Sequence, residues 1–347
     1  MINGKRRTAD QYVNGAPINL REEAINAGLI PSSYVGDIFR QGCYLYLSNG
    51  FIKQKDIPKS SAQILHCKKR LPTAFIIGVK KSGTTTLGRY VDLHENIVVA
   101  HNARLYTNRS TYTVEQSVHQ YYQSMPYSTE DEITVANFPG YYWMNRPSFL
   151  QALPYMPENP KIIAILRNPV KRAISDYRHM QDTRESYSES RRHIPTFLGD
   201  DIRSTFEETV LLPNGSINAT LNFIQQGMYA KHLSQFVKFI PRKRILLLSG
   251  DEFAKNPLLS LRKVEQFLGV KPFYKDDYFV YNKEKGFYCA EIPSRPDWNC
   301  MSDLKGRSHP NVSEEVLKKL EEFYKPYNLK LGAQFDLLSS NFEWIRK

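Results

Sequence analysis

Short apolar runs recur along this chain and predict the strands of a buried sheet. Residues 75–79, 97–100, 162–166 and 245–248 are almost wholly apolar and rich in β-branched side chains. Runs of this length and composition are typical of strands, whereas helices need longer segments. We therefore expect each run to form a strand in the interior of the protein.

Apolar residues at helical spacing mark the segments between and after these runs. Ser313 is suited to cap the last such segment, and residues 324–328 are expected to end it. Strands that alternate with helices predict an α/β fold. The expected helices cover residues 87–93, 115–126, 223–239, 257–268 and 316–323.

Polar composition sets two segments apart from the rest of the chain. Residues 1–70 are polar and mixed, and a Pro-Lys-Ser-Ser run at 58–61 reads as a linker. We predict an N-terminal extension over residues 1–70 and one main domain over residues 71–347. Residues 182–220 are rich in Arg, Ser and Glu, and predict a long surface excursion.

A glycine-rich turn follows the first apolar run. Gly78 and Gly83 flank it, Lys80 and Lys81 lie inside it, and Thr84 is suited to begin a helix. A strand, a glycine loop and a helix together cradle a phosphate, because backbone N–H groups and the helix dipole converge on the anion. A P-loop has Lys directly after its second glycine, where this chain has Thr84. The pattern therefore favours a phosphorylated donor other than ATP.

Arg167 stands at the end of another apolar run, at residues 162–166. Open α/β sheets bind ligands at the carboxyl ends of their strands, and a guanidinium offers a fork of donors that suits a phosphate. Pro169 fits the first turn of a helix, on which Ser175 and Tyr177 would follow.

These two stretches resemble the sulfotransferases that use 3′-phosphoadenosine 5′-phosphosulfate (PAPS). Residues 81–86 are similar to the family's loop for the 5′-phosphosulfate, and residues 167–177 to its segment for the 3′-phosphate. A third similarity runs from Gly286-Phe-Tyr-Cys289 through Cys300 to Lys305-Gly306-Arg307. The order of the motifs resembles the Golgi carbohydrate sulfotransferases of the heparan N- and 3-O-sulfating type, and also the chondroitin 6-O-sulfating enzymes. The resemblance covers residues 71–347.

The resemblance implies a P-loop-like three-layer sandwich, in which helices flank a central parallel β-sheet. It implies transfer of a sulfuryl group from PAPS to a hydroxyl or amine of a carbohydrate, here a glycosaminoglycan, with no metal ion. Lys81 would neutralise the charge that grows as sulfate leaves. The implied donor-binding residues are Lys81, Ser82, Gly83, Thr84, Thr85, Thr86, Arg167, Ser175, Tyr288 (or Phe287 beside it), Lys305, Gly306 and Arg307.

The acceptor side departs from the family pattern. Where the related enzymes carry a Glu that serves as base, this chain has Asn102 or Ala103, depending on the spacing used. His101 is adjacent and titrates near neutral pH, so it is either the base or an ordinary surface histidine. No Lys stands in residues 134–150, where the family has one, and the aromatic residues 141–143 fit either sugar stacking or the core.

The formal net charge is +12, which favours a polyanionic partner. Sulfated glycans, nucleic acids and anionic membranes all fit such a charge, but no nucleic-acid-binding module is recognisable. We expect an anionic carbohydrate acceptor and no nucleic acid. No His, Cys and carboxylate cluster has the spacing of a zinc site.

Sequons and cysteines point to an oxidising compartment. Sequons stand at Asn108, Asn214, Asn218 and Asn311. The resemblance supports a Cys289–Cys300 disulfide, whereas Cys43 and Cys67 either pair or stay free thiols. No apolar run reaches the length of about 18 residues that a transmembrane helix needs. We expect a protein of the Golgi lumen whose membrane anchor is absent from this sequence.

Two other functions remain open from the sequence. A P-loop-type kinase would share the fold class, but Thr84 in place of Lys argues against it. A glycan-binding relative that has lost its catalytic base would explain the missing Glu.

Overall fold

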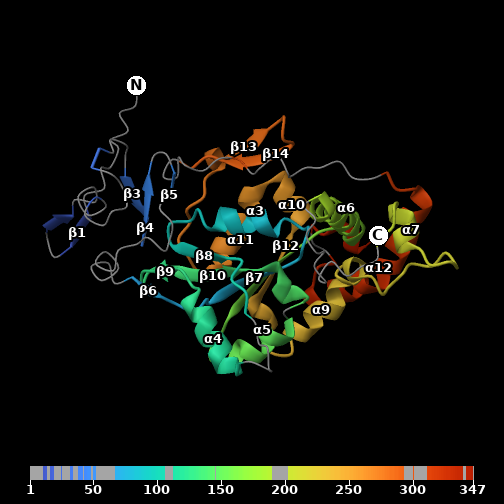
Figure 1. Cartoon of the computed structure of the whole chain (residues 1–347), viewed down its shortest axis with the longest axis horizontal. Helices are drawn as coiled ribbons and strands as arrows, with labels where there is room; N and C mark the ends of the chain where they lie inside the picture. Colours follow the sequence, from blue (N-terminus) through green and yellow to red (C-terminus); the bar gives the residue numbers. More distant parts are fainter. Residues whose placement is uncertain are drawn as a thin grey trace.

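The computed structural model describes residues 67–105, 112–144, 146–189, 202–292, 311–338 and 341–346, with Cys300 and short pieces before residue 52. Its centre is a five-stranded sheet in the order β12-β11-β7-β10-β8, and every neighbouring pair is parallel (Figure 1). The strands are β7 (Ala74–Gly78), β8 (Ile97–His101), β10 (Ile133–Asn137), β11 (Lys161–Leu166) and β12 (Ile245–Ser249).

Side-chain alternation along the strands explains why helices cover both faces of the sheet. In β7, Ala74 and Ile76 belong to one apolar cluster, whereas Phe75 and Ile77 belong to another on the opposite face. Because all five residues of β7 are buried, the strand needs a packed layer on each side. The predicted α/β fold, with a central parallel sheet between helices, is confirmed.

Two groups of helices form these layers, one above and one below the sheet in Figure 1. The layer that shares the cluster of Ile76 consists of α3 (Thr84–Val91), α10 (Gly250–Lys255) and α11 (Pro257–Leu268). The layer that shares the cluster of Phe75 contains α4 (Val114–Gln123), α5 (Arg146–Ala152), α9 (Tyr229–Phe236) and the second half of α12 (Glu314–Phe335).

A third apolar cluster fills the space beside the sheet. It joins α6 (Pro169–Glu189), α7 (Phe206–Val210), α8 (Asn222–Gln225) and the first half of α12. The remaining strands are β1 (Gln11–Val13), β2 (Ala16–Ile18), β3 (Ile38–Gln41), β4 (Tyr44–Leu47), β5 (Gly50–Phe51), β6 (Lys68–Lys69), β9 (Tyr127–Ser128), β13 (Phe279–Asn282) and β14 (Phe287–Ala290).

The boundaries of two predicted helices differ from those in the structure. The helix expected over residues 223–239 is split into α8 and α9, because Gly227 packs against the ring of Tyr324 at a distance that leaves no room for a side chain. Helix α12 does not end at residue 324 but continues through Pro326. The hydrogen bond that Pro326 removes belongs to the carbonyl of Glu322, and both residues are exposed, so water can replace it.

The predicted surface excursion over residues 182–220 is only partly correct. Helix α6 continues to Glu189, and residues 190–201 lie outside the described residues. Phe206 and Val210 of α7 are buried, and a capping box of Thr205 and Glu208 begins that short helix. This segment therefore adds to the core instead of lying wholly at the surface.

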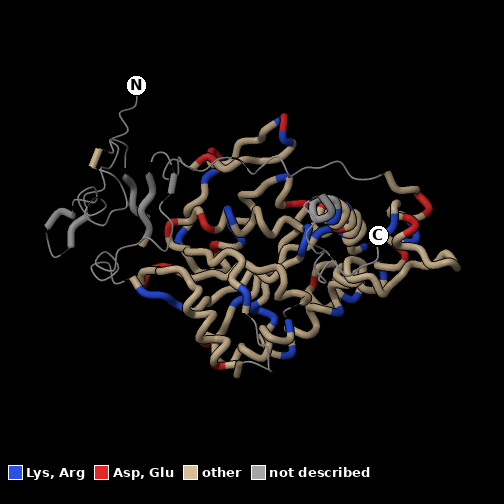
Figure 2. The backbone as a smooth tube through the Cα atoms, viewed as in Figure 1, with Lys and Arg blue, Asp and Glu red and all other residues tan. Residues whose placement is uncertain are grey.

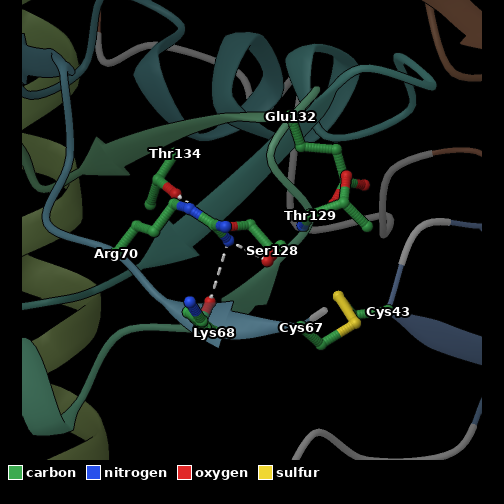
Figure 3. The surroundings of a disulfide bond; sticks show 8 residues. All are labelled: Cys43, Cys67, Lys68, Arg70, Ser128, Thr129, Glu132 and Thr134. Carbon is green, nitrogen blue, oxygen red and sulfur yellow. Dashed lines mark hydrogen bonds between the residues drawn. A yellow bond between two sulfur atoms is a disulfide. The ribbon is translucent and has the colours of Figure 1, made fainter. Parts of the chain in front are cut away.

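Both cysteine pairs form disulfides, Cys43–Cys67 and Cys289–Cys300, so the expected second pair is confirmed and the open question over the first is settled. Cys67 directly precedes β6, which pairs with β9 (Figure 3). Next to β6, the Arg70 guanidinium donates to the carbonyl oxygen of Ser128, whose hydroxyl lies 3.2 Å from that of Thr134 (Figure 3). The disulfide thus joins the segment around Cys43 to the edge of the main domain. The domain boundary at residue 70 stays a prediction.

Candidate functional site

The candidate site lies where the chain changes direction across the sheet. After β7 the chain builds β8 and β10 on one side, and then β11 and β12 on the other. Open α/β sheets bind ligands at such a switch point, outside the carboxyl ends of the strands. The glycine loop follows β7 and Arg167 follows β11, and β7 and β11 are neighbouring strands.

The glycine loop has a fixed backbone. The N–H of Val79 donates to the carbonyl of Ile165 in β11 (2.9 Å), and the N–H of Ser82 donates to the carbonyl of Val79 (3.1 Å). Lys81 has a left-handed backbone with φ of 70°, which is uncommon for a residue other than glycine and often marks functional loops. Gly83, with φ of 104°, begins α3 at the position where only glycine is unstrained.

The three threonines after Gly83 lie in different surroundings. Thr84 is buried, and its hydroxyl donates to the carbonyl of Val79 (2.8 Å). Its proton therefore stabilises the loop, and does not point to an anion as the resemblance implied. Thr85 is exposed and Thr86 is half-buried at the start of α3.

Arg167 and Ser175 are placed by the start of α6. Asn168 caps this helix, since its side-chain oxygen accepts from the N–H groups of Val170 (2.9 Å) and Lys171 (3.1 Å). The hydroxyl of Tyr229 donates to the carbonyl of Arg167 (2.7 Å) and so fixes the backbone at the strand end. Arg167 and Ser175 are both half-buried.

Gly250, at the end of β12, brings the two halves of the site together. A Cβ atom at this position would lie 2.6 Å from the carbonyl oxygen of Ser82 and 3.6 Å from Cβ of Arg167. The loop after β7 and the end of β11 therefore approach each other across a backbone that has no side chain. The structure thus places Ser82 and Arg167 close to one another on either side of Gly250.

The loop rests on a buried ionic cluster that the sequence did not reveal. Asp176 and Arg172 of α6 are both fully buried, with Arg172 Nη1 2.9 Å from Asp176 Oδ2. Lys80 Nζ, from the glycine loop, lies 2.8 Å from the other carboxylate oxygen, Oδ1. The signal that was available is the i, i+4 spacing of an Arg and an Asp on the same helix face as apolar residues.

Tyr288 lies in the hairpin of β13 and β14, beside α3. The hydroxyl of Tyr90 in α3 donates to the carbonyl of Tyr288 (2.6 Å), and the ring of Tyr288 is half-buried against that of Tyr281. Lys305, Gly306 and Arg307 lie outside the described residues.

The structure does not bring His101 together with Lys81. His101 ends β8, and its Nε2 atom lies 3.4 Å from Oδ2 of Asp92, which follows the carboxyl end of α3. Lys81 precedes the opposite end of this helix, which is about 12 Å long at 1.5 Å per residue. Asn102 has a left-handed backbone with φ of 56°, and Ala103 is buried.

The tyrosines of residues 141–143 are part of the core. Tyr141 and Tyr142 are fully buried, and the hydroxyl of Tyr141 donates to the carbonyl of Ala103 (2.6 Å). Stacking of these two rings on a sugar is therefore excluded, and the core alternative is correct. Their burial follows from the large apolar area of an aromatic ring, which packs where β7 and α5 leave space.

His232 of α9 is a structural residue, as predicted. It is 1% exposed; its Nε2 atom lies 2.9 Å from the carbonyl of Gln225, and Arg146 Nη1 lies 2.8 Å from its Nδ1 atom. Burial lowers its pKa from 6.5 to about 4, and the nearby Arg146 acts in the same direction.

This lowered pKa predicts a pH-dependent stability. Between pH 6.5 and about 4 the unfolded chain holds a proton on His232 that the folded chain does not, so stability is lost as the pH falls. We expect the free energy of unfolding in urea to fall by about 3 kcal/mol over this range because of His232. The variant His232→Gln should lose this part of the pH dependence, and His119→Gln, at an exposed position of α4, should retain it. Equal pH profiles for the wild type and His232→Gln would contradict the prediction.

Among the described residues, no helix combines the length and the apolar character needed to cross a membrane. Figure 2 shows Lys and Arg at many places along the described chain. In the sequence, Lys68, Lys69 and Arg70 are consecutive.

Comparison with known proteins gives the family. Residues 71–335 match the sulfotransferase domain. The chain is 34% identical over 280 residues to heparan sulfate glucosamine 3-O-sulfotransferase 3B1 of Homo sapiens, covering 80% of this chain and 65% of that protein. It is 29% identical over 281 residues to heparan sulfate glucosamine 3-O-sulfotransferase 6 of Homo sapiens, covering 80% of this chain and 75% of that protein. A sulfotransferase from Alicyclobacillus acidocaldarius has a solved structure with 20% identity and a TM-score of 0.47, covering 80% of this chain and 99% of that chain.

The chain spans less than two thirds of the length of the 3B1 relative and of the 3A1 relative of Homo sapiens, at 65% and 63%. The match to the domain nevertheless covers most of this chain, and the sheet edge carries the glycine loop beside Arg167. The resemblance seen in the motifs is thus confirmed: this chain belongs to the sulfotransferase domain family.

Proposed function

We propose that this protein transfers the sulfuryl group of PAPS to a hydroxyl of a glycosaminoglycan. The observation that carries the proposal is the approach of the glycine loop and Arg167 at one edge of the sheet, across Gly250. Two elements that can each bind an anion, close together at one edge of the sheet, suit a donor that carries a phosphosulfate at one end and a separate phosphate on its ribose. The names of the relatives make a glucosamine 3-O position of heparan sulfate the first candidate acceptor site.

The loop residues have distinct roles in this proposal. Backbone N–H groups of Gly83, Thr84 and Thr85, at the positive end of α3, hold the 5′-phosphate, while the N–H of Ser82 keeps its bond to Val79 inside the loop. Lys81 stabilises the negative charge that develops on the oxygen between phosphate and sulfate as that bond breaks. Gly83 and Thr86 belong to the same cradle, and the hydroxyl of Thr84 keeps the loop in shape.

Arg167 and Ser175 hold the 3′-phosphate, and this contact selects PAPS over nucleotides without that group. Tyr288 contributes an aromatic face for the adenine beside α3. Lys305, Gly306 and Arg307 are proposed to close over the phosphates. The protein's own groups supply in-line alignment and charge stabilisation, and the reaction as proposed needs no metal ion.

One more role to assign is that of the base, which takes the proton of the acceptor hydroxyl. His101 is the candidate, and its side chain, 37% exposed, must turn away from Asp92 to reach an acceptor hydroxyl. A general base in such a reaction typically contributes about 10²–10⁴ to the rate. If His101 is the base, kcat of the wild type falls at low pH as His101 becomes protonated. The loss of this fall in His101→Gln would support the role.

An oxidising compartment fits both disulfides, and we propose the Golgi lumen. The sequon residues Asn214 and Asn311 are exposed, as N-glycosylation requires. The net charge of +12 fits a polyanionic acceptor.

Transfer of labelled sulfate from PAPS to a set of glycans tests the proposal. The set contains N-sulfated heparan sulfate, fully desulfated heparan sulfate and chondroitin, each assayed with and without EDTA. We expect transfer to a heparan substrate that EDTA does not reduce, with label at a glucosamine 3-O position after digestion to disaccharides. Binding of adenosine 3′,5′-bisphosphate without transfer to any acceptor would favour the glycan-binding alternative, and turnover of ATP would favour the kinase.

A further inference from the structure

The two neighbouring lysines of the glycine loop lie in different surroundings. Lys80 turns toward α6, where its Nζ atom lies 2.8 Å from Oδ1 of Asp176. Lys81 follows at the residue where the backbone is left-handed, with φ of 70°. The resemblance implied a role only for Lys81, whereas the structure shows that Lys80 has a carboxylate partner beneath the loop.

Asp176 is an unusual partner because it is fully buried. Burial by itself raises the pKa of a carboxyl group, but Lys80 and Arg172 outweigh it and hold the pKa of Asp176 below its ordinary value. The side chain is therefore a carboxylate at neutral pH. Its two oxygens face two different cations, one from the loop and one from its own helix. A buried charge is tolerated only with partners of this kind.

Arg172 extends the cluster to the backbone of the loop. Its Nη1 atom lies 3.5 Å from the carbonyl oxygen of Lys80, and its Nη2 atom donates to the carbonyl of Phe223 at α8. The loop is therefore joined to α6 twice at the same residue, once through the side chain of Lys80 and once through its carbonyl group. No part of the proposed reaction uses these contacts directly.

We propose that Asp176 is a positioning residue for the donor, which holds Lys80 against α6 and thereby orients Lys81 and the loop backbone. The inference rests on the proposed sulfotransferase function. Ser175, next to Asp176 on α6, is a proposed ligand of the 3′-phosphate. The buried carboxylate thus links the loop for one end of the donor to the helix for the other end, and keeps the two in a fixed relation.

The alternative is that Lys80 binds the donor itself. In that case Asp176 competes with the donor for Lys80, and removal of the Asp176 carboxylate would leave the affinity for the donor unchanged or improve it. If Asp176 acts through Lys80, removal of either partner harms the same step. A double-mutant cycle therefore separates the two possibilities.

The test compares the wild type with Lys80→Met, Lys80→Arg, Asp176→Asn and the double variant Lys80→Met/Asp176→Asn. We expect Lys80→Met to lower kcat at saturating PAPS by about 10- to 100-fold, because small errors in orientation cost this much. Lys80→Arg, which keeps the charge, should restore most of the rate. The double variant should be no slower than Asp176→Asn alone, since the pair is already broken. All rates are measured well below the melting temperature of each variant, so that a loss of stability alone does not change them.

Lys171→Met is the matched control, since Lys171 lies exposed on the same helix and should leave kcat unchanged. If Asp176→Asn does not fold, the comparison of Lys80→Met with Lys80→Arg decides. A normal kcat in Lys80→Met, or additive losses in the cycle, would overturn the inference. Failure of the wild type to bind adenosine 3′,5′-bisphosphate would instead refute the proposed function, so the two failures are distinguishable.

Discussion

Replacing Lys81 with methionine should lower kcat for sulfuryl transfer by about 10²–10³, as loss of one group aimed at developing charge does in other enzymes. Methionine keeps most of the side-chain length but carries no charge. Lys81 stands in the turn between β7 and α3, where hydrogen bonds of Val79 and Ser82 hold the backbone. Since the charge grows only in the transition state, the affinity for adenosine 3′,5′-bisphosphate should change much less than kcat.

The measurement is the initial rate of labelled sulfate transfer at saturating PAPS, together with calorimetry of the bisphosphate. The control is Lys263→Met, which removes an exposed ion pair of α11 with Glu252 (2.6 Å) outside the loop. A variant Lys81→Met that keeps kcat within about threefold of the wild type would rule out this role, since the loss expected from a charged stabiliser is far larger.

Replacing Arg167 with alanine should weaken the binding of adenosine 3′,5′-bisphosphate by about 10- to 100-fold. Hydrogen bonds to a charged group are worth about 1.5–3 kcal/mol, and each 1.4 kcal/mol is a factor of ten. Arg167 is half-buried, its backbone is fixed by Tyr229, and a guanidinium can make a bidentate contact with a phosphate.

A second nucleotide serves as the control for this experiment. Adenosine 5′-phosphate lacks the 3′-phosphate, so its affinity should be nearly the same for the wild type and Arg167→Ala. Arg178→Ala, which removes the exposed pair of Arg178 with Asp182 on α6 (3.1 Å), should leave both ligands unaffected. Equal losses for the two nucleotides in Arg167→Ala would mean that Arg167 does not recognise the 3′-phosphate.

The sequence predicted most of the sheet, and it located the glycine turn and the strand end that flank the candidate site, because short apolar runs and glycine turns carry local signals. Strand β10 was missed, since Ile133–Asn137 includes a Thr and an Asn and so does not read as a continuous apolar run. It lies between β7 and β8, and only the pairing of strands distant in the sequence shows its place.

Other differences from the sequence prediction have a common cause, which is contact between distant parts of the chain. The break at Gly227 depends on the ring of Tyr324, about a hundred residues away, and no local propensity reports it. The burial of Tyr141 and Tyr142 depends likewise on the apolar layer around α5 and α9. The spacing of Arg172 and Asp176 was visible in the sequence, but the contact of Asp176 with Lys80 was not, because Lys80 belongs to another element and a charged residue on a helix is usually exposed.

The hydrogen bonds between β7 and β11 have a consequence for ligand choice. They hold the start of the glycine loop and the end of β11 in register, and the N–H of Val79 continues the contact beyond the last strand pair. The separation of the two proposed anion sites is therefore set by the pairing of β7 with β11. On the proposed reading of the site, a nucleotide whose phosphates form one uninterrupted chain lacks the separate phosphate that Arg167 would hold.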